Sequence, residues 1–129
     1  MSIELWSIVA LSLMLLAVTL MQGVLVPITQ GLKWGLGNRD EPVHTSAIQN
    51  RFARTVQNQI EAMLIYLPLM ALVLILERAS EMTAIAAWLM IAGRFAFILF
   101  YLTGTFGLRS IAYGMSIIAV FMTLGALLM

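Results

Sequence analysis

Residues 5–32 of the chain read LWSIVALSLMLLAVTLMQGVLVPITQGL, and none of these 28 residues carries a formal charge. About 20 consecutive apolar residues are enough for a helix to cross a bilayer. The stretch therefore predicts a membrane-spanning helix, which we expect over about residues 3–33. A secretory signal would start with Lys or Arg and end in a small-residue cleavage site. The segment has neither feature, so we expect it to remain in the mature protein.

The composition of the whole chain agrees with a membrane protein. Hydrophobic residues make up 62% of the 129 residues and charged residues 10%, whereas about a quarter of a soluble domain is charged. The formal net charge of +1 is not gathered into a basic tail or stripe, which argues against a nucleic-acid partner. We therefore expect an integral membrane protein in contact with membrane lipids.

Three further apolar segments predict three more spanning helices. We expect them over about residues 47–77, 82–103 and 108–128. One polar loop, at about residues 34–46, contains Gly, Asn, Asp and Pro in turn-forming positions. Ser46 and Gln49 form a capping-box pattern that predicts the start of the second long helix. Short connections between four helices predict a single all-α domain, a four-helix up-down bundle.

Basic residues are distributed unequally between the two ends of this bundle. Apart from Arg94, which falls within the third span, Arg78 alone falls at one end and five basic residues fall at the opposite end: Lys33, Arg39, Arg51, Arg54 and Arg109. Because basic residues near membrane spans stay in the cytoplasm, we expect the polar loop to be cytoplasmic. Both termini should then lie on the non-cytoplasmic side.

A stripe of polar residues interrupts the second long helix. Its members are Arg51, Arg54, Asn58 and Glu61. At about 100° per residue they share an arc of roughly 80°. An unpaired charge within a membrane costs about 2.5 kcal/mol or more, so Glu61 needs a partner. Arg94 of the third helix is the most economical one, and we expect an Arg94–Glu61 ion pair.

Two interpretations of these polar residues stay open. Arg51 and Arg54 could be snorkelling residues at the membrane edge, and Asn58, Glu61 and Arg94 could form a clamp that only holds helices together. A binding site is favoured by the charge balance, because the arginines near the inner end outnumber the single internal acid. Such a surplus suits a small anion with carboxylates, which guanidinium groups bind in a bidentate manner.

The ordered pattern on the last three helices resembles the MAPEG family, the membrane-associated proteins in eicosanoid and glutathione metabolism. Its residues are Arg54, Asn58, Glu61, Arg94, Tyr101, Arg109, Ser110 and Tyr113. The loop residues 37–42, GNRDEP, look like those of bacterial members. The resemblance covers most of the chain and implies a homotrimer, which we expect in the bacterial inner membrane.

The resemblance also implies glutathione as cosubstrate, bound between subunits near the cytoplasmic side. It assigns glutathione contacts to Arg54, Asn58, Glu61, Tyr101 and Arg109, with Arg51 at the pocket mouth. Arg94 would be structural or at the pocket floor, and Tyr113 is a further candidate binding residue. Arg109 and Ser110 are the candidates for stabilising the glutathione thiolate, and Lys33 is a weaker third. The chain departs from enzyme members at Phe97, where these carry Tyr or His.

The cysteine and histidine content agrees with a reaction in which the thiol is supplied by glutathione and not by the protein. The chain has no cysteine and one histidine, His44. A lone histidine predicts no metal site, and the absence of cysteine excludes a cysteine nucleophile. We expect a membrane glutathione transferase or peroxidase acting on a lipophilic small molecule. The alternatives are a non-catalytic member that binds lipid or partner proteins and, more remotely, a small four-helix exporter.

Overall fold

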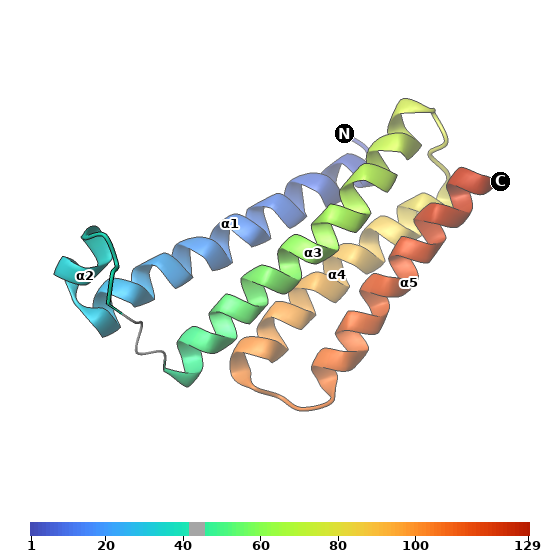
Figure 1. Cartoon of the computed structure of the whole chain (residues 1–129). Coiled ribbons are helices and arrows are strands. Elements are labelled where there is room, and N and C mark those ends of the chain that lie inside the picture. The colour runs from blue at the N-terminus through green and yellow to red at the C-terminus, as the bar shows by residue number, and fades with distance from the viewer. Residues whose placement is uncertain (42–45) are drawn as a thin grey trace.

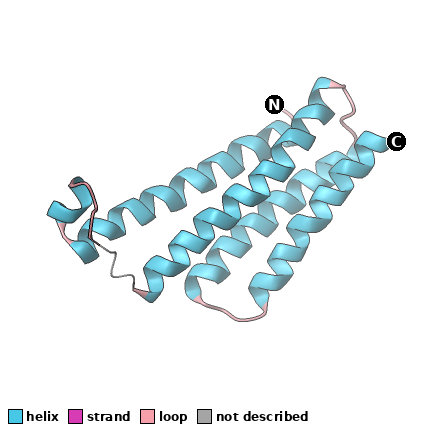
Figure 2. Ribbon diagram, viewed as in Figure 1, coloured by secondary structure: helices cyan, strands magenta, loops and turns pink. Residues whose placement is uncertain are grey.

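The computed structural model describes residues 1–41 and 46–129, and these residues form helices joined by turns (Figures 1 and 2). The helices are α1 (Ile3–Gln30), α2 (Leu32–Leu36), α3 (Ala47–Ile75), α4 (Glu81–Thr103) and α5 (Leu108–Leu128). Over these described residues there is no strand, which confirms the all-α fold. Helices α1, α3, α4 and α5 are long and apolar enough to cross a membrane. His44 lies outside the described residues.

The helix predicted over residues 3–33 is shorter than expected. Helix α1 ends at Gln30, because Gly31 adopts a φ of 86° that is incompatible with a continuing right-handed helix. The short helix α2 follows immediately and extends into the segment expected to be loop. Lys33 therefore lies on α2 and not on the spanning helix.

Side-chain caps fix where α3 and α4 begin. The Ser46 hydroxyl accepts a hydrogen bond from the backbone N–H of Gln49, and the side-chain oxygen of Gln49 accepts one from the backbone N–H of Ser46. These two bonds confirm the predicted capping box. Ser80 and Thr83 form the same arrangement at the start of α4. These reciprocal bonds satisfy backbone donors that have no partner within the helix.

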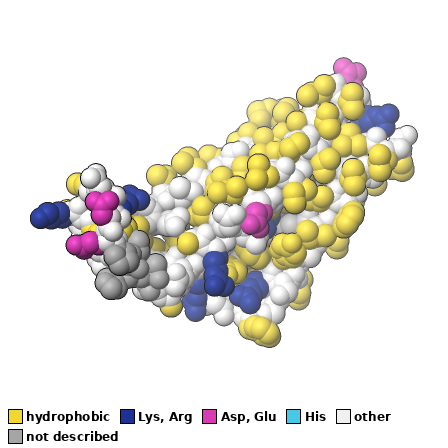
Figure 3. All heavy atoms as spheres, viewed as in Figure 1, with side chains coloured by type: hydrophobic (Ala, Val, Ile, Leu, Met, Phe, Trp, Pro, Cys, Tyr) yellow, Lys and Arg dark blue, Asp and Glu magenta, His cyan; other side chains and the backbone are white. Residues whose placement is uncertain are grey.

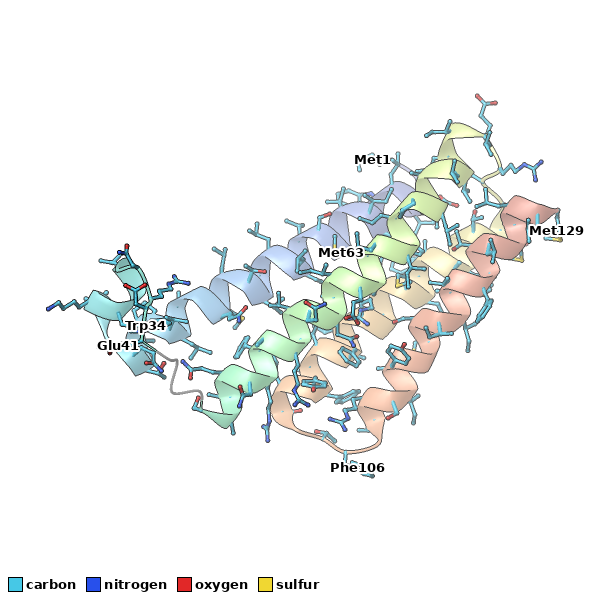
Figure 4. The ribbon with its side chains drawn as sticks, viewed as in Figure 1. Met1, Trp34, Glu41, Met63, Phe106 and Met129 are labelled. Carbon is cyan, nitrogen blue, oxygen red and sulfur yellow. The ribbon has the colours of Figure 1, made fainter. Side chains whose placement is uncertain are left out.

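The four long helices run up and down, so both termini lie at one end of the bundle (Figure 1). Trp34 and Glu41 near α2, and Phe106 between α4 and α5, lie at the opposite end (Figure 4). A core of side chains from α1, α3, α4 and α5 includes Leu11, Tyr66, Met70, Met90 and Ala119. The face shown in Figure 3 is largely apolar between the two ends of the bundle, and large apolar side chains are exposed on all four long helices, as expected for helices that face lipid.

Candidate functional site

A buried arginine joins α4 to the polar residues of α3. The Arg94 side chain is fully buried. Its Nε donates to Gln59 Oε1 at 2.9 Å, and its Nη1 donates to Asn58 Oδ1 at 3.2 Å. Its Cζ also lies 4.6 Å from the centre of the Phe97 ring, a distance at which a cation is attracted to the ring face. Arg94 is thus held by two neutral amides and an aromatic ring.

The prediction of an Arg94–Glu61 ion pair was wrong, because the two side chains have other partners. Glu61 is exposed and accepts a bond from Gln57 Nε2 at 2.9 Å, one turn earlier on the same helix. Gln59, which is fully buried, occupies the position facing Arg94. A buried ion pair requires two charges to lose their hydration, whereas amide acceptors require this of Arg94 alone. Glu61 therefore stays at the surface and the amides point inward.

Arg51 caps the end of α4. Its Nη1 donates to the Leu102 carbonyl at 3.3 Å, and its guanidinium lies against Gly104. Gly104 has a φ of 75° in the left-handed region, so the chain turns there and leaves room for the guanidinium. A cation at a helix C-terminus interacts favourably with the free carbonyls. The role of Arg51 within the chain is therefore structural, in addition to the charge it places at this end.

Three aromatic rings form a row beside the arginines. Phe97 lies 5.4 Å from Tyr101 and 6.3 Å from Tyr113, measured between ring centres. The Cζ of Arg109 lies 5.3 Å from the centre of the Tyr101 ring. The row fixes the directions of Arg94 and Arg109 through ring contacts. Phe97, where the resemblance implied Tyr or His, is the middle ring of the row.

A cavity of about 100 Å³ opens between α3, α4 and α5. Its polar lining comes from Asn58, Glu61, Arg94, Tyr113 and Ser116. The Nη2 atom of Arg94 is buried and is the one buried side-chain nitrogen or oxygen of the described residues without a hydrogen-bond partner. Pockets that enclose whole small molecules measure about 300–1,000 Å³. The cavity of one chain therefore has room for one end group of a tripeptide and not for all of it.

The remaining candidate residues lie at the surface. Arg54 and Ser110 are exposed, and Arg109 is half-buried. Figure 3 shows basic side chains gathered at the end of the bundle where α3 begins. Lys33 is not brought into this group, since it lines a separate hollow beside Trp34 and Arg39. The cavity thus brings together Asn58, Glu61, Arg94 and Tyr113, the ring contacts place Tyr101 and Arg109 beside them, and Lys33 lies apart.

Gln59 was missed by sequence reasoning. Its side chain donates to the Leu11 carbonyl of α1 at 3.3 Å and accepts from Arg94, so it connects three helices. The sequence did contain a signal, namely a glutamine within a predicted membrane span, because burying a side-chain amide there is costly unless it has hydrogen-bond partners. It was overlooked because Gln59 falls outside the arc shared by Arg54, Asn58 and Glu61.

Comparison with protein families adds one finding. A model of the MAPEG family matches residues 5–129, which is essentially the whole chain. Comparisons with curated proteins and with solved structures gave no match. The family is generally associated with glutathione. The match covers all four spanning helices and every residue of the site described above, so the chain belongs to the MAPEG family.

Proposed function

We propose that the chain is a glutathione-binding membrane protein that acts as a transferase or peroxidase on lipophilic substrates. The observation that supports this most is the arrangement around the cavity, which Arg94 lines together with Asn58 and Tyr113. Such donors suit the carboxylates of glutathione. The proposed binding residues are Arg51, Arg54, Asn58, Glu61, Arg94, Tyr101, Arg109 and Tyr113.

A second copy of the chain would complete the site. Glu61 is exposed at the middle of α3, a helix long enough to span the membrane. A charge facing lipid at this depth is costly, which supports a protein neighbour over this face. The small volume of the cavity within one chain supports the same conclusion. We propose a homotrimer with glutathione between neighbouring subunits.

The chemistry follows from the cation next to the proposed thiol position. An ordinary thiol has a pKa of about 8.5, and a nearby guanidinium lowers this pKa because it favours the thiolate. Arg109 would supply the charge and the Ser110 hydroxyl a hydrogen bond. In a transferase reaction the thiol proton leaves to water, the sulfur bonds to an electrophilic carbon, and the bond from that carbon to its leaving group breaks, so that the group departs with the electron pair as an anion. In a peroxidase reaction two glutathione molecules and a hydroperoxide give glutathione disulfide, an alcohol and water.

Calorimetry on the detergent-purified protein tests the proposal. We expect glutathione to bind the wild type, and Arg54→Ala to weaken binding by about tenfold or more, since hydrogen bonds between charged groups are lost. Arg39→Ala is a matched control, because Arg39 stacks on Trp34 in the separate hollow. It should change the affinity by less than about twofold. Absence of binding to the wild type would refute the proposed function.

The non-catalytic alternative has one observation in its favour. Lys33 lies outside the group of arginines, so Arg109 and Ser110 alone remain to stabilise a thiolate. Glutathione binding without thiolate absorbance or turnover would favour this alternative. Proton-coupled transport in proteoliposomes that is abolished by Glu61→Gln would instead favour an exporter.

A further inference from the structure

Three polar side chains within the bundle form a continuous chain of hydrogen bonds that ends at the proposed site. It starts at the Leu11 carbonyl of α1, which accepts from Gln59 Nε2 at 3.3 Å. Gln59 Oε1 accepts from Arg94 Nε at 2.9 Å, and Arg94 Nη1 donates to Asn58 Oδ1 at 3.2 Å. Gln59 and Arg94 are fully buried, and Asn58 lines the cavity.

The chemistry of these groups allows one orientation of each amide. Leu11 offers only an acceptor and Arg94 offers only donors, so the Gln59 amide cannot turn over without opposing like groups on both sides. The Asn58 amide is fixed in the same way, because its oxygen must face Arg94. The Asn58 amide nitrogen is then directed away from Arg94 and is a donor for a ligand.

Several groups next to the cavity can therefore donate hydrogen bonds to a ligand. Asn58 Nδ2 is one, and the Tyr113 hydroxyl, which lines the cavity, is another. The Ser116 hydroxyl also lines the cavity but donates its proton to the Ala112 carbonyl at 3.3 Å, and the Nη2 of Arg94 is itself buried.

Among the described residues, the contacts of Arg94 are two amides and a ring, and none is a carboxylate. Glu61 also lines the cavity and is bonded to Gln57, so the side of the cavity at Asn58 and Tyr113 is the one suited to accepting a carboxylate.

We infer that Arg94, held by Gln59, is a positioning residue that orients Asn58 so that its amide nitrogen donates to a carboxylate of glutathione. The inference rests on the proposed function. Its distinctive feature is that the effect of Arg94 on binding passes through Asn58. A residue that only held the helices together would affect stability and leave the orientation of Asn58 without consequence.

A double-mutant cycle on the glutathione affinity tests this route. We expect Asn58→Ala and Arg94→Gln each to weaken binding by about tenfold. The double variant should bind within about twofold of Asn58→Ala, because Arg94 has nothing left to orient. Losses that multiply would show that Arg94 acts independently of Asn58, and this would overturn the inference. An unchanged affinity in Arg94→Gln would overturn it as well.

A second pair of variants keeps Arg94 intact in case Arg94→Gln does not fold. Gln59→Glu retains an oxygen for Arg94 Nε but places its second oxygen against the Leu11 carbonyl. We expect this variant to be less stable and yet to bind glutathione within about threefold of the wild type. Gln59→Met removes that oxygen and should weaken binding by about tenfold, with a raised KM for glutathione and an unchanged kcat. Equal affinities of these two variants would overturn the inference. Failure of the wild type to bind glutathione would instead refute the proposed function, and the inference with it.

Discussion

Gly93 of α4 lies directly against Ser116 of α5. A Cβ atom on Gly93 would be 3.0 Å from the Ser116 hydroxyl oxygen and equally close to the Ala112 carbonyl oxygen and the Met115 Cβ. The absence of a side chain at this position allows the two helices to approach closely, as small residues do at helix contacts in membranes. Ser116 lines the cavity and Arg94 follows Gly93, so the close approach also sets the width of the cavity.

Gly93→Ala should therefore destabilise the protein by about 1–3 kcal/mol, because backbone and buried atoms would have to move apart. The free energy of unfolding can be measured by denaturant titration in detergent micelles. Gly114→Ala on α5 is the control, since a Cβ there meets nothing within 4 Å. It should be neutral or stabilising by up to about 1 kcal/mol, as alanine favours helices. Equal destabilisation by both substitutions would contradict this explanation.

Ser7→Ala should cost more stability than Tyr66→Phe, although the two hydroxyls share one hydrogen bond of 2.8 Å. The Ser7 hydroxyl donates its single proton to the Glu4 carbonyl at 2.6 Å, so the buried Tyr66 hydroxyl must be the donor to Ser7. Ser7→Ala leaves Tyr66 without a partner and should cost about 1–3 kcal/mol, against about 0.5–1.5 kcal/mol for Tyr66→Phe. Unfolding in detergent measures both, and the reverse order would show that this assignment of donors is wrong.

Single cysteines should report the orientation in the membrane. The chain has no cysteine of its own, so the wild type gives no background labelling. We expect a membrane-impermeant maleimide to label Ala79→Cys in intact cells and Asn38→Cys only after permeabilisation, because the basic end should be cytoplasmic. Both positions are exposed and lie at opposite ends of the bundle. The opposite labelling pattern would contradict the proposed orientation.

The pH dependence of bound glutathione should identify the thiolate stabiliser. If Arg109 lowers the pKa of the thiol, its removal raises that pKa. In Arg109→Ala the thiolate absorbance should then appear at a higher pH than in the wild type, and each pH unit corresponds to about 1.36 kcal/mol. Arg109→Lys keeps the charge and should retain most of the effect. Identical titrations of wild type and Arg109→Ala at saturating glutathione would exclude this role for Arg109.

The spanning helices could be predicted because hydrophobic length is a property of consecutive residues. The start of α3 was also predictable, since the capping box of Ser46 and Gln49 is a local signal. The end of α1 depended on the backbone conformation of Gly31, which the composition of the segment does not reveal. A glycine within a spanning helix can continue the helix or end it.

The partner of Arg94 could not be predicted because it depends on how α3 is rotated. Gln59 and Glu61 are two residues apart, which at about 100° per residue places them on opposite faces of the helix. Charge alone favoured Glu61, whereas packing against α1 and α4 turned Gln59 inward. The buried Glu4 was missed for a similar reason, because its partner Thr83 is provided by α4 and lies far away in sequence.

Two arginines fix the axial register of α3 within the bundle. Arg51 near its start donates to the Leu102 carbonyl of α4 at 3.3 Å, and Arg78 just after its end donates to the Leu127 carbonyl of α5 at 2.8 Å. Sliding α3 along its axis in either direction would strain both attachments. The depth of Asn58 relative to Arg109 is thus set from both membrane surfaces. Any widening of the cavity must then come from tilting or rotation of α3, α4 or α5, and not from a piston-like shift of α3.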